Sequence, residues 1–153
     1  MREAVIETGK IRGIACGWPS ITAFYGIPYA APPVGELRWR PPQPAAPWPG
    51  VRDCARPGPR CPQLGVGKGS FYEREFYPVE EPMDEDCLYL NVWTPAQSAG
   101  ERLPVIFWVH GGAFMTGYGH SAHFDGEPFA RQGVILVTIN YRLNIFAWMP
   151  HPQ

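Results

Sequence analysis

The sequence has neither a marked excess of charge nor a long hydrophobic run. Its 13 basic residues nearly balance its 14 acidic residues, for a net charge of −1, so we expect no strongly basic face that could neutralise nucleic-acid phosphates or anionic lipid headgroups. The longest apolar runs, residues 105–109 and 134–137, fall far short of the ~20 residues that a membrane-spanning helix needs. Neither nucleic acid nor a membrane is therefore an expected partner.

Cysteine is also scarce, and the start of the chain has no apolar segment. The cysteines form no C-x-x-C pair, which argues against a zinc ribbon or another metal framework. The N-terminus lacks the hydrophobic stretch of a secretory signal. These features predict a cytoplasmic protein without a metal or cofactor, whose cysteines are free thiols. The four are Cys16, Cys54, Cys61 and Cys87.

Proline, in contrast, is abundant near the N-terminus. Twelve of the 19 prolines lie in residues 1–62, so this part cannot be mainly helical. Residues 4–6 and 11–14 flank a turn signal and predict a short antiparallel hairpin, and residues 21–25 predict a further strand. Residues 32–62 are expected to cross the surface as a long loop. Three apolar anchors would hold that loop down, Leu37, Trp39 and Trp48.

The second half of the chain has the pattern of a strand, a helix and another strand. Residues 63–86 show no sustained period and predict an irregular connection, followed by a strand at 88–93. The continuous apolar runs at 105–109 and 134–139 are typical of strands buried on both faces. Between them, residues 124–133 favour a short helix with an acidic start and a glycine stop. This order predicts a parallel crossover in an α/β fold.

Several segments together resemble the signatures of the type B carboxylesterases, the family that includes the cholinesterases. They occur in the family's order and spacing between about residues 5 and 151, and are Phe24–Ala30 with Pro32–Trp39, Gly58–Gln63, Glu85–Trp93, His110–Phe114 and Asn140–Leu143. The resemblance implies an α/β-hydrolase fold with a mostly parallel central sheet and helices on both sides. Residues 1–153 would then form the N-terminal portion of one incomplete domain.

The segment His110–Phe114 resembles the oxyanion loop of this family. Ester hydrolysis passes through a tetrahedral intermediate with a negatively charged oxygen, which preorganised backbone N–H groups stabilise. Glycine permits the close backbone approach that such a loop needs. The resemblance implies that Gly112 and Ala113 donate these N–H groups and that Gly111 belongs to the same loop, with a third donor following the nucleophile. Alanine replaces the more common glycine at position 113 and keeps the N–H.

Two residue pairs match pairs of the family. Arg38 and Glu85 correspond to a salt bridge that joins the N-terminal loop to the second signature. Both lie beside large apolar residues, where an unpaired charge would be costly. Cys61 and Cys87 correspond to a disulfide of secreted members, but without a signal peptide we expect thiols.

The serine that the resemblance requires is absent from these 153 residues. Family members place it in G-x-S-x-G at a sharp strand-to-helix turn, with the acid and histidine much later in the chain. The only serines are Ser20, Ser70, Ser98 and Ser121, and none lies in this pentapeptide. We therefore expect a truncation before the nucleophile, and a chain that is inactive alone.

Two serine motifs imitate parts of a catalytic site. Ala96–Gly100 has alanine where the elbow needs its first glycine, and it lies in a polar loop. Gly119–His123 lacks the final glycine. On an extended strand, Ser121, His123 and Asp125 would share one face but point in parallel rather than converge. The pair His120 and His123 has no third ligand in place and is weak as a metal site.

The sequence thus supports two hypotheses of different classes. The first is a carboxylic ester hydrolase with a serine acyl-enzyme mechanism, in which this chain supplies the oxyanion loop and the substrate is a small carboxylic ester. The second is a non-catalytic, cholinesterase-like binding or adhesion module. A Gly-x-Ser-x-Gly downstream of Gln153 would favour the enzyme. Acyl preference and oligomeric state leave no sequence signal.

Overall fold

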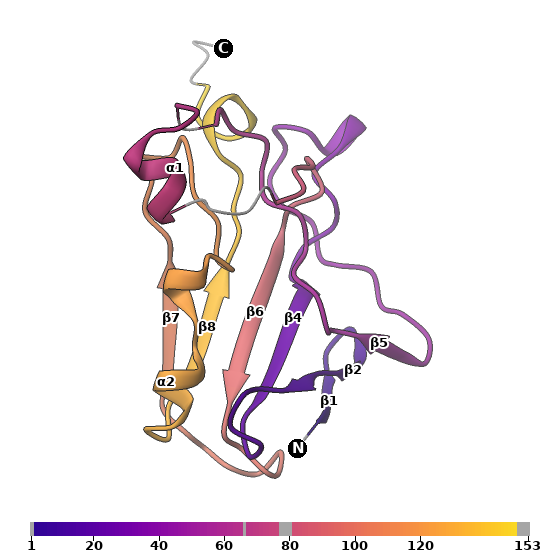
Figure 1. Cartoon of the computed structure of the whole chain (residues 1–153). Coiled ribbons are helices and arrows are strands. Elements are labelled where there is room, and N and C mark those ends of the chain that lie inside the picture. Colours follow the sequence, from indigo (N-terminus) through magenta and orange to yellow (C-terminus); the bar gives the residue numbers. More distant parts are fainter. Residues whose placement is uncertain (1, 66, 77–80, 150–153) are drawn as a thin grey trace.

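The computed structural model describes residues 2–65, 67–76 and 81–149, and these form two sheets with little helix. A five-stranded sheet has the order β3-β4-β6-β8-β7, and a three-stranded sheet has the order β1-β2-β5. Figure 1 shows β7, β8, β6 and β4 side by side, with the smaller sheet next to β4. The described part of the chain is therefore a layered α/β structure.

The N-terminal hairpin is confirmed, with a tighter turn than the sequence predicted. Strand β1 (Glu3–Ile6) pairs antiparallel with β2 (Gly9–Arg12). Strand β2 also pairs in parallel with β5 (Val51–Asp53), which lies inside the segment that was expected to be a loop. Of the three anchors in that loop, Trp48 packs against the core and donates a 2.8 Å hydrogen bond to the Lys10 carbonyl, and Leu37 is half-buried. The ring of Trp39 is mostly exposed, so it anchors less surface than predicted.

The large sheet is mixed rather than mostly parallel. Strands β7 (Val105–Val109) and β8 (Ile135–Ile139) are parallel, which confirms the predicted crossover. Strands β3 (Ile14–Ala15), β4 (Thr22–Pro28) and β6 (Tyr89–Thr94) continue the sheet through antiparallel pairs only. The expectation of a mostly parallel sheet is therefore wrong for the described residues. Of these antiparallel pairs, β3–β4 is joined by a short connection, which suits antiparallel pairing, whereas β4–β6 and β6–β8 are joined through long segments.

Helical structure is limited to short segments. Helix α1 (Phe71–Phe76) lies in the stretch predicted to be irregular. Helix α2 (Glu127–Ala130) occupies the middle of the predicted helix and is preceded by a 3₁₀ turn, Ala122–Phe124. Further 3₁₀ turns are Gly35–Leu37 and Asn144–Phe146. None of the helices in the described ranges has the length and apolar character required to cross a membrane.

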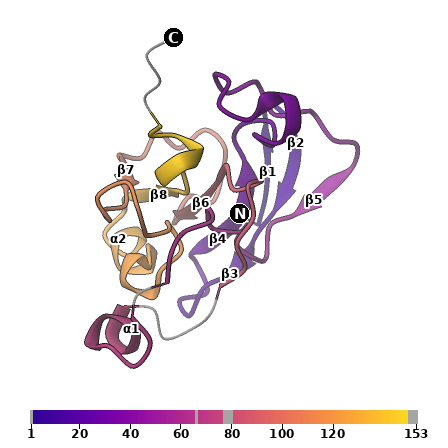
Figure 2. The same ribbon diagram turned by 90° about the horizontal axis from the view of Figure 1, so that it is seen from above.

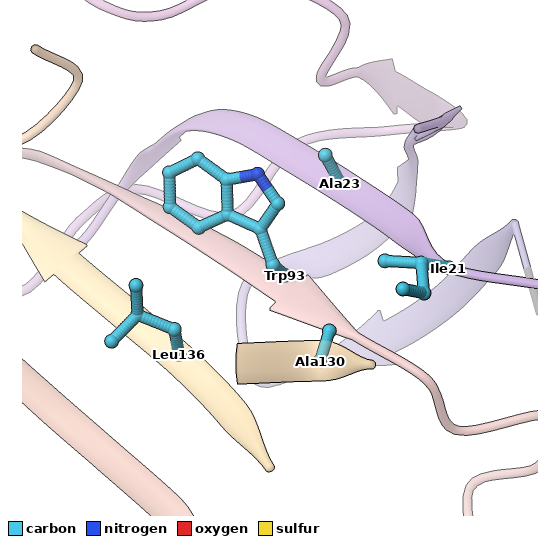
Figure 3. Packing of buried hydrophobic residues seen from close by; sticks show 5 residues of the cluster. All are labelled: Ile21, Ala23, Trp93, Ala130 and Leu136. Carbon is cyan, nitrogen blue, oxygen red and sulfur yellow. The ribbon is translucent and has the colours of Figure 1, made fainter. Parts of the chain in front are cut away.

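The core lies on both faces of the centre of the large sheet. On one face, α2 covers β6 and β8, and Figure 3 shows the side chains of this cluster, Ile21, Ala23, Trp93, Ala130 and Leu136. Gly126 packs so closely on the Trp93 ring that a Cβ there would lie 2.5 Å from it. On the other face, Phe24 and Ile27 pack with Ile11 and Cys54 against the small sheet, which forms a separate layer in Figure 2. Because side chains alternate along β4, this strand contributes residues to the core on both faces of the sheet.

Strand β7 is not buried, contrary to its apolar sequence. All five of its residues are between 37% and 58% exposed. The strand forms the edge of the sheet, and α2 packs mainly on β6 and β8. Strand β8, with a neighbour on each side, alternates between buried and half-buried residues. The prediction of burial on both faces is therefore wrong for β7 in this chain, because the described residues cover it only in part, as where the Phe124 ring lies 5.3 Å from that of Trp108.

Candidate active site

The glycine loop, residues 110–119, follows β7 directly. Because β7 and β8 are parallel, this loop lies at the same end of the sheet as residues 140–144, which follow β8. In Figure 1 both segments lie at the upper ends of these strands. The carboxyl ends of parallel strands are the usual place for ligand sites in α/β sheets. The predicted oxyanion residues therefore lie at the end of the sheet where chemistry is expected.

The backbone of the glycine loop turns sharply through three successive residues with positive φ. These are Gly112 (φ 125°), Ala113 (φ 53°) and Phe114 (φ 61°). The N–H groups of Met115 and Thr116 donate to the carbonyl of Gly112 at 2.9 and 3.1 Å and close the turn. A Cβ at position 112 would lie 1.9 Å from the Thr116 carbonyl oxygen, so only glycine fits there. Left-handed conformations at alanine and phenylalanine are uncommon and persist only when surrounding contacts impose them.

The turn presents two backbone donors to solvent. Gly112 and Ala113 are exposed, and neither N–H donates to an acceptor among residues 2–65, 67–76 and 81–149. Such donors can bind an oxygen atom that carries negative charge, and they need no reorganisation if the loop is rigid. Gly111 lies at the start of the turn and is also exposed.

Residues after β8 hold the loop at three points. Tyr141 Oη donates a 2.8 Å hydrogen bond to the His110 carbonyl, at the beginning of the loop. The N–H of Asn144 donates to the Phe114 carbonyl at 2.7 Å. Near the end of the loop, the N–H of Gly119 donates to Asn140 Oδ1 at 2.7 Å, in a buried contact.

Two histidine side chains, of His110 at the start of the loop and of His120 directly after it, are buried and favour the neutral state. His110 donates from Nδ1 to the Gly111 carbonyl at 2.8 Å, and its ring stacks on Tyr141 with centroids 4.4 Å apart. Burial lowers the pKa of His110 below its usual value. The pKa of His120 is lowered to about 4, mainly by burial and further by the charges of Arg60 and His110. The imidazole rings of His110 and His120 are therefore uncharged at neutral pH.

The predicted ion pair between the N-terminal loop and the second signature is present. Arg38 donates from Nε and Nη2 to the two carboxylate oxygens of Glu85 at 2.6 and 2.8 Å. The carboxylate of Glu85 raises the pKa of Arg38 above its ordinary value. This fork geometry fixes the loop around residue 38 against the segment that leads into β6.

The cysteines are thiols in this structure. Cys61 and Cys87 are both buried in one cluster with Leu88 and Leu143. A hydrogen bond from the Cys87 thiol lowers the pKa of Cys61, and the same contact together with burial raises the pKa of Cys87. The N–H of Leu143 donates to Cys61 Sγ at 3.2 Å, so this pair also connects to the segment after β8.

Neither serine motif has the strand-to-helix geometry of a nucleophile elbow. Ser98 lies in an exposed loop after β6, and its Oγ donates to Glu101 Oε1 at 3.2 Å. Ser121 Oγ lies 3.3 Å from His123 Nδ1, because a 3₁₀ turn brings the two together. The segment is therefore a turn and not an extended strand, and it is not a strand-to-helix elbow either. Within the described ranges, no group of three or more His, Cys, Asp or Glu residues is placed to hold a metal ion.

The residues that support the loop were not predicted from the sequence. Gln63, Asn140 and Tyr141 all lie in segments that carry the family resemblance, yet their sequence positions do not reveal that they contact residues 110–119. Asn140 also donates from Nδ2 to the Pro59 carbonyl at 2.9 Å, so it bridges two segments. Polar side chains directly after an apolar strand were the only available signal.

Comparison with known proteins identifies the family to which this fold and this glycine loop belong. A family model described as the carboxylesterase family matches residues 2–151, and this chain belongs to that family. Two relatives are hydrolases by their names: the chain is 42% identical over 146 residues to the fumonisin B1 esterase of Sphingopyxis macrogoltabida and 44% identical over 134 residues to the phenmedipham hydrolase of Pseudarthrobacter oxydans. These matches cover 95% and 84% of this chain.

Solved structures give the same result. A pNB esterase superposes with a TM-score of 0.86 at 38% identity over 98% of this chain. The carboxylesterase EST55 of Geobacillus stearothermophilus superposes with a TM-score of 0.80 at 40% identity over 95% of it. The chain spans about a quarter of the length of the two curated relatives, 25% and 26%, and 27% to 30% of these structures.

Proposed function

We propose that this chain is the N-terminal part of a carboxylic ester hydrolase and that its glycine loop supplies the oxyanion donors. One observation carries the proposal: Gly112 and Ala113 present unpaired backbone N–H groups on a clamped turn at the carboxyl ends of β7 and β8. Membership of the carboxylesterase family supports this assignment. The named relatives that act on esters favour hydrolysis over a non-catalytic binding module.

In the proposed reaction, a serine hydroxyl from a later part of a longer protein attacks the carbonyl carbon of a small carboxylic ester. The carbonyl oxygen becomes an oxyanion, which accepts hydrogen bonds from the N–H groups of Gly112 and Ala113. Collapse of this intermediate expels the alcohol and leaves an acyl-enzyme, which water then hydrolyses in a second step of the same kind. The loop acts in both steps because each passes through a tetrahedral oxyanion.

The downstream coding sequence provides the first test. A Gly-x-Ser-x-Gly within the next strand-turn-helix unit after Gln153 is expected, and another residue at the serine position would favour the binding module. In the longer protein, Gly112→Pro removes one donor and distorts the loop. Loss of one oxyanion donor typically lowers kcat by ~10²–10³-fold. An unchanged kcat, in a variant whose thermal transition shows that it is folded, would place the oxyanion site elsewhere.

A further inference from the structure

We infer that Gln63 is the positioning residue that holds the glycine loop in its donor geometry, an inference that rests on the proposed function. Gln63 is separated by 54 residues from the loop residue that it binds. Its primary amide nevertheless pairs with the backbone of the loop at Gly117 and with its own segment at Cys61.

The amide of Gln63 pairs with Gly117 as a neighbouring strand would. Gln63 Oε1 accepts a 2.7 Å hydrogen bond from the N–H of Gly117, and Nε2 donates to the Gly117 carbonyl at 3.0 Å. The second hydrogen of Nε2 goes to the Cys61 carbonyl at 3.0 Å, which fixes the plane of the amide. Two carbonyls and one N–H thus demand two donors and one acceptor, which a primary amide supplies.

Gly117 transmits this constraint to the start of the turn. A Cβ on Gly117 would lie 2.5 Å from His110 Nδ1 and 2.6 Å from the Gly111 carbonyl oxygen, so the closing limb of the loop rests directly on its opening limb. His110 Nδ1 in turn donates to that same Gly111 carbonyl. Gly112 is the next residue. Movement of Gly117 would therefore shift the peptide units that carry the proposed donors.

Gln63 is itself attached to a firm base. The Pro62 carbonyl accepts a 2.8 Å hydrogen bond from Asn144 Nδ2, and Cys61 Sγ accepts one from the Leu143 N–H. Cys61 is buried in the cluster below. These contacts hold the backbone of residues 61–63 in place, so the amide can act as a fixed brace rather than as a mobile side chain.

The test uses Gln63→Glu and Gln63→Ala in the longer protein that carries this chain. Glutamate keeps the length and one acceptor but removes both Nε2 donors and directs a carboxylate at two carbonyls. Alanine removes the brace without adding charge, so it remains informative if the glutamate variant fails to fold. The matched control is Gln97→Glu, because Gln97 Nε2 also donates to two backbone carbonyls, of Ser20 and Pro95, but follows β6 at the opposite end of the sheet.

Three quantities are measured: kcat and KM on a p-nitrophenyl ester, the thermal midpoint, and hydrogen exchange of peptides that cover residues 110–119. Displacement of a catalytic group by about 1 Å can reduce the rate ~10²-fold. We expect both Gln63 variants to lower kcat by ~10- to 100-fold, to change KM less than ~2-fold, and to accelerate exchange in the loop while β4 and β6 keep their protection. The control should keep the wild-type kcat, KM and exchange of residues 110–119.

The outcomes separate this inference from the function on which it rests. An active wild type whose kcat and loop exchange are unaffected by both Gln63 variants overturns the positioning role and leaves the proposed function intact. The positioning role is also overturned if kcat falls together with the thermal midpoint while hydrogen exchange rises throughout the protein and not mainly in residues 110–119. An inactive wild type counts against the proposed function, and the exchange of residues 110–119 still decides whether Gln63 holds the loop.

Discussion

The glycine loop and strand β7 are consecutive in the chain but are stabilised in opposite ways. The loop is braced by directional hydrogen bonds with Gln63, Asn140 and Tyr141, and Ala113 and Phe114 have positive φ angles that are uncommon for residues other than glycine. Strand β7 has a regular backbone and a fully apolar sequence, yet its side chains remain exposed. The geometry of the candidate site is thus determined within this chain, whereas the burial that β7 requires is not.

The largest expected effect is a complete absence of serine-dependent esterase activity in the 153-residue chain. The braced loop offers donors, but no G-x-S-x-G serine accompanies them. Purified chain should not hydrolyse a p-nitrophenyl ester above background. Turnover that disappears in Ser98→Ala or Ser121→Ala would show that one of these serines is a real nucleophile.

A side chain at position 112 should lower the kcat of the longer protein by about two orders of magnitude. Gly112→Ala keeps the N–H but places a Cβ 1.9 Å from the Thr116 carbonyl oxygen, at φ 125°. Because the loop must shift, we expect a ~10²-fold loss. Gly100→Ala is the control, since no atom lies within 4 Å of a Cβ there. Similar kcat values for the two variants would mean that the turn tolerates displacement.

Acid should weaken the interior beneath the loop. The pKa of His120 is about 4 in the folded protein and 6.5 as the ordinary value, so below pH 6.5 the unfolded chain binds a proton that the folded chain excludes. Stability is therefore complete above pH 6.5 and declines as the pH falls towards 4, by at most about 3 kcal/mol. Arg60 and His110 oppose protonation, whereas Glu81 Oε2, 3.8 Å from His120 Nε2, favours it.

Urea midpoints of the longer protein between pH 7 and 4.5 measure this effect. His120→Gln should flatten the dependence on pH. A steep decline that persists in His120→Gln would assign the acid sensitivity to other groups.

The smallest effects concern the surface of β7. The five apolar residues at an open edge favour intermolecular pairing, so the chain alone should form oligomers or aggregates. Phe107→Lys should increase the monomer fraction several-fold in size-exclusion chromatography, because a charge on an edge strand opposes association. Val5→Lys on β1, whose pair with β2 already carries the Glu3–Arg12 ion pair, is the control and should change little. A monomeric wild type with a sharp thermal transition would contradict the idea.

The elements that short stretches of sequence specify could be predicted. The hairpin at Glu3–Arg12, strand β6 and the parallel pair β7–β8 follow from short-range patterns of apolar residues and turn signals. The pairing of β5 with β2 and the exposure of β7 depend on contacts between distant segments, which periodicity does not encode. The same holds for the site, because the glycines marked the loop, while the bracing amide of Gln63 became visible only in three dimensions.

The braces also have a consequence for synthesis. The hydrogen bonds that brace the glycine loop come from residues up to position 144, and the ring of Trp148 packs on Phe114 with centroids 4.4 Å apart. A ribosome makes the chain from its N-terminus, and domains and their parts can form as they emerge. The donors can therefore reach their final geometry before any later residue exists. During that interval the exposed edge strand β7 is open to pairing with other chains.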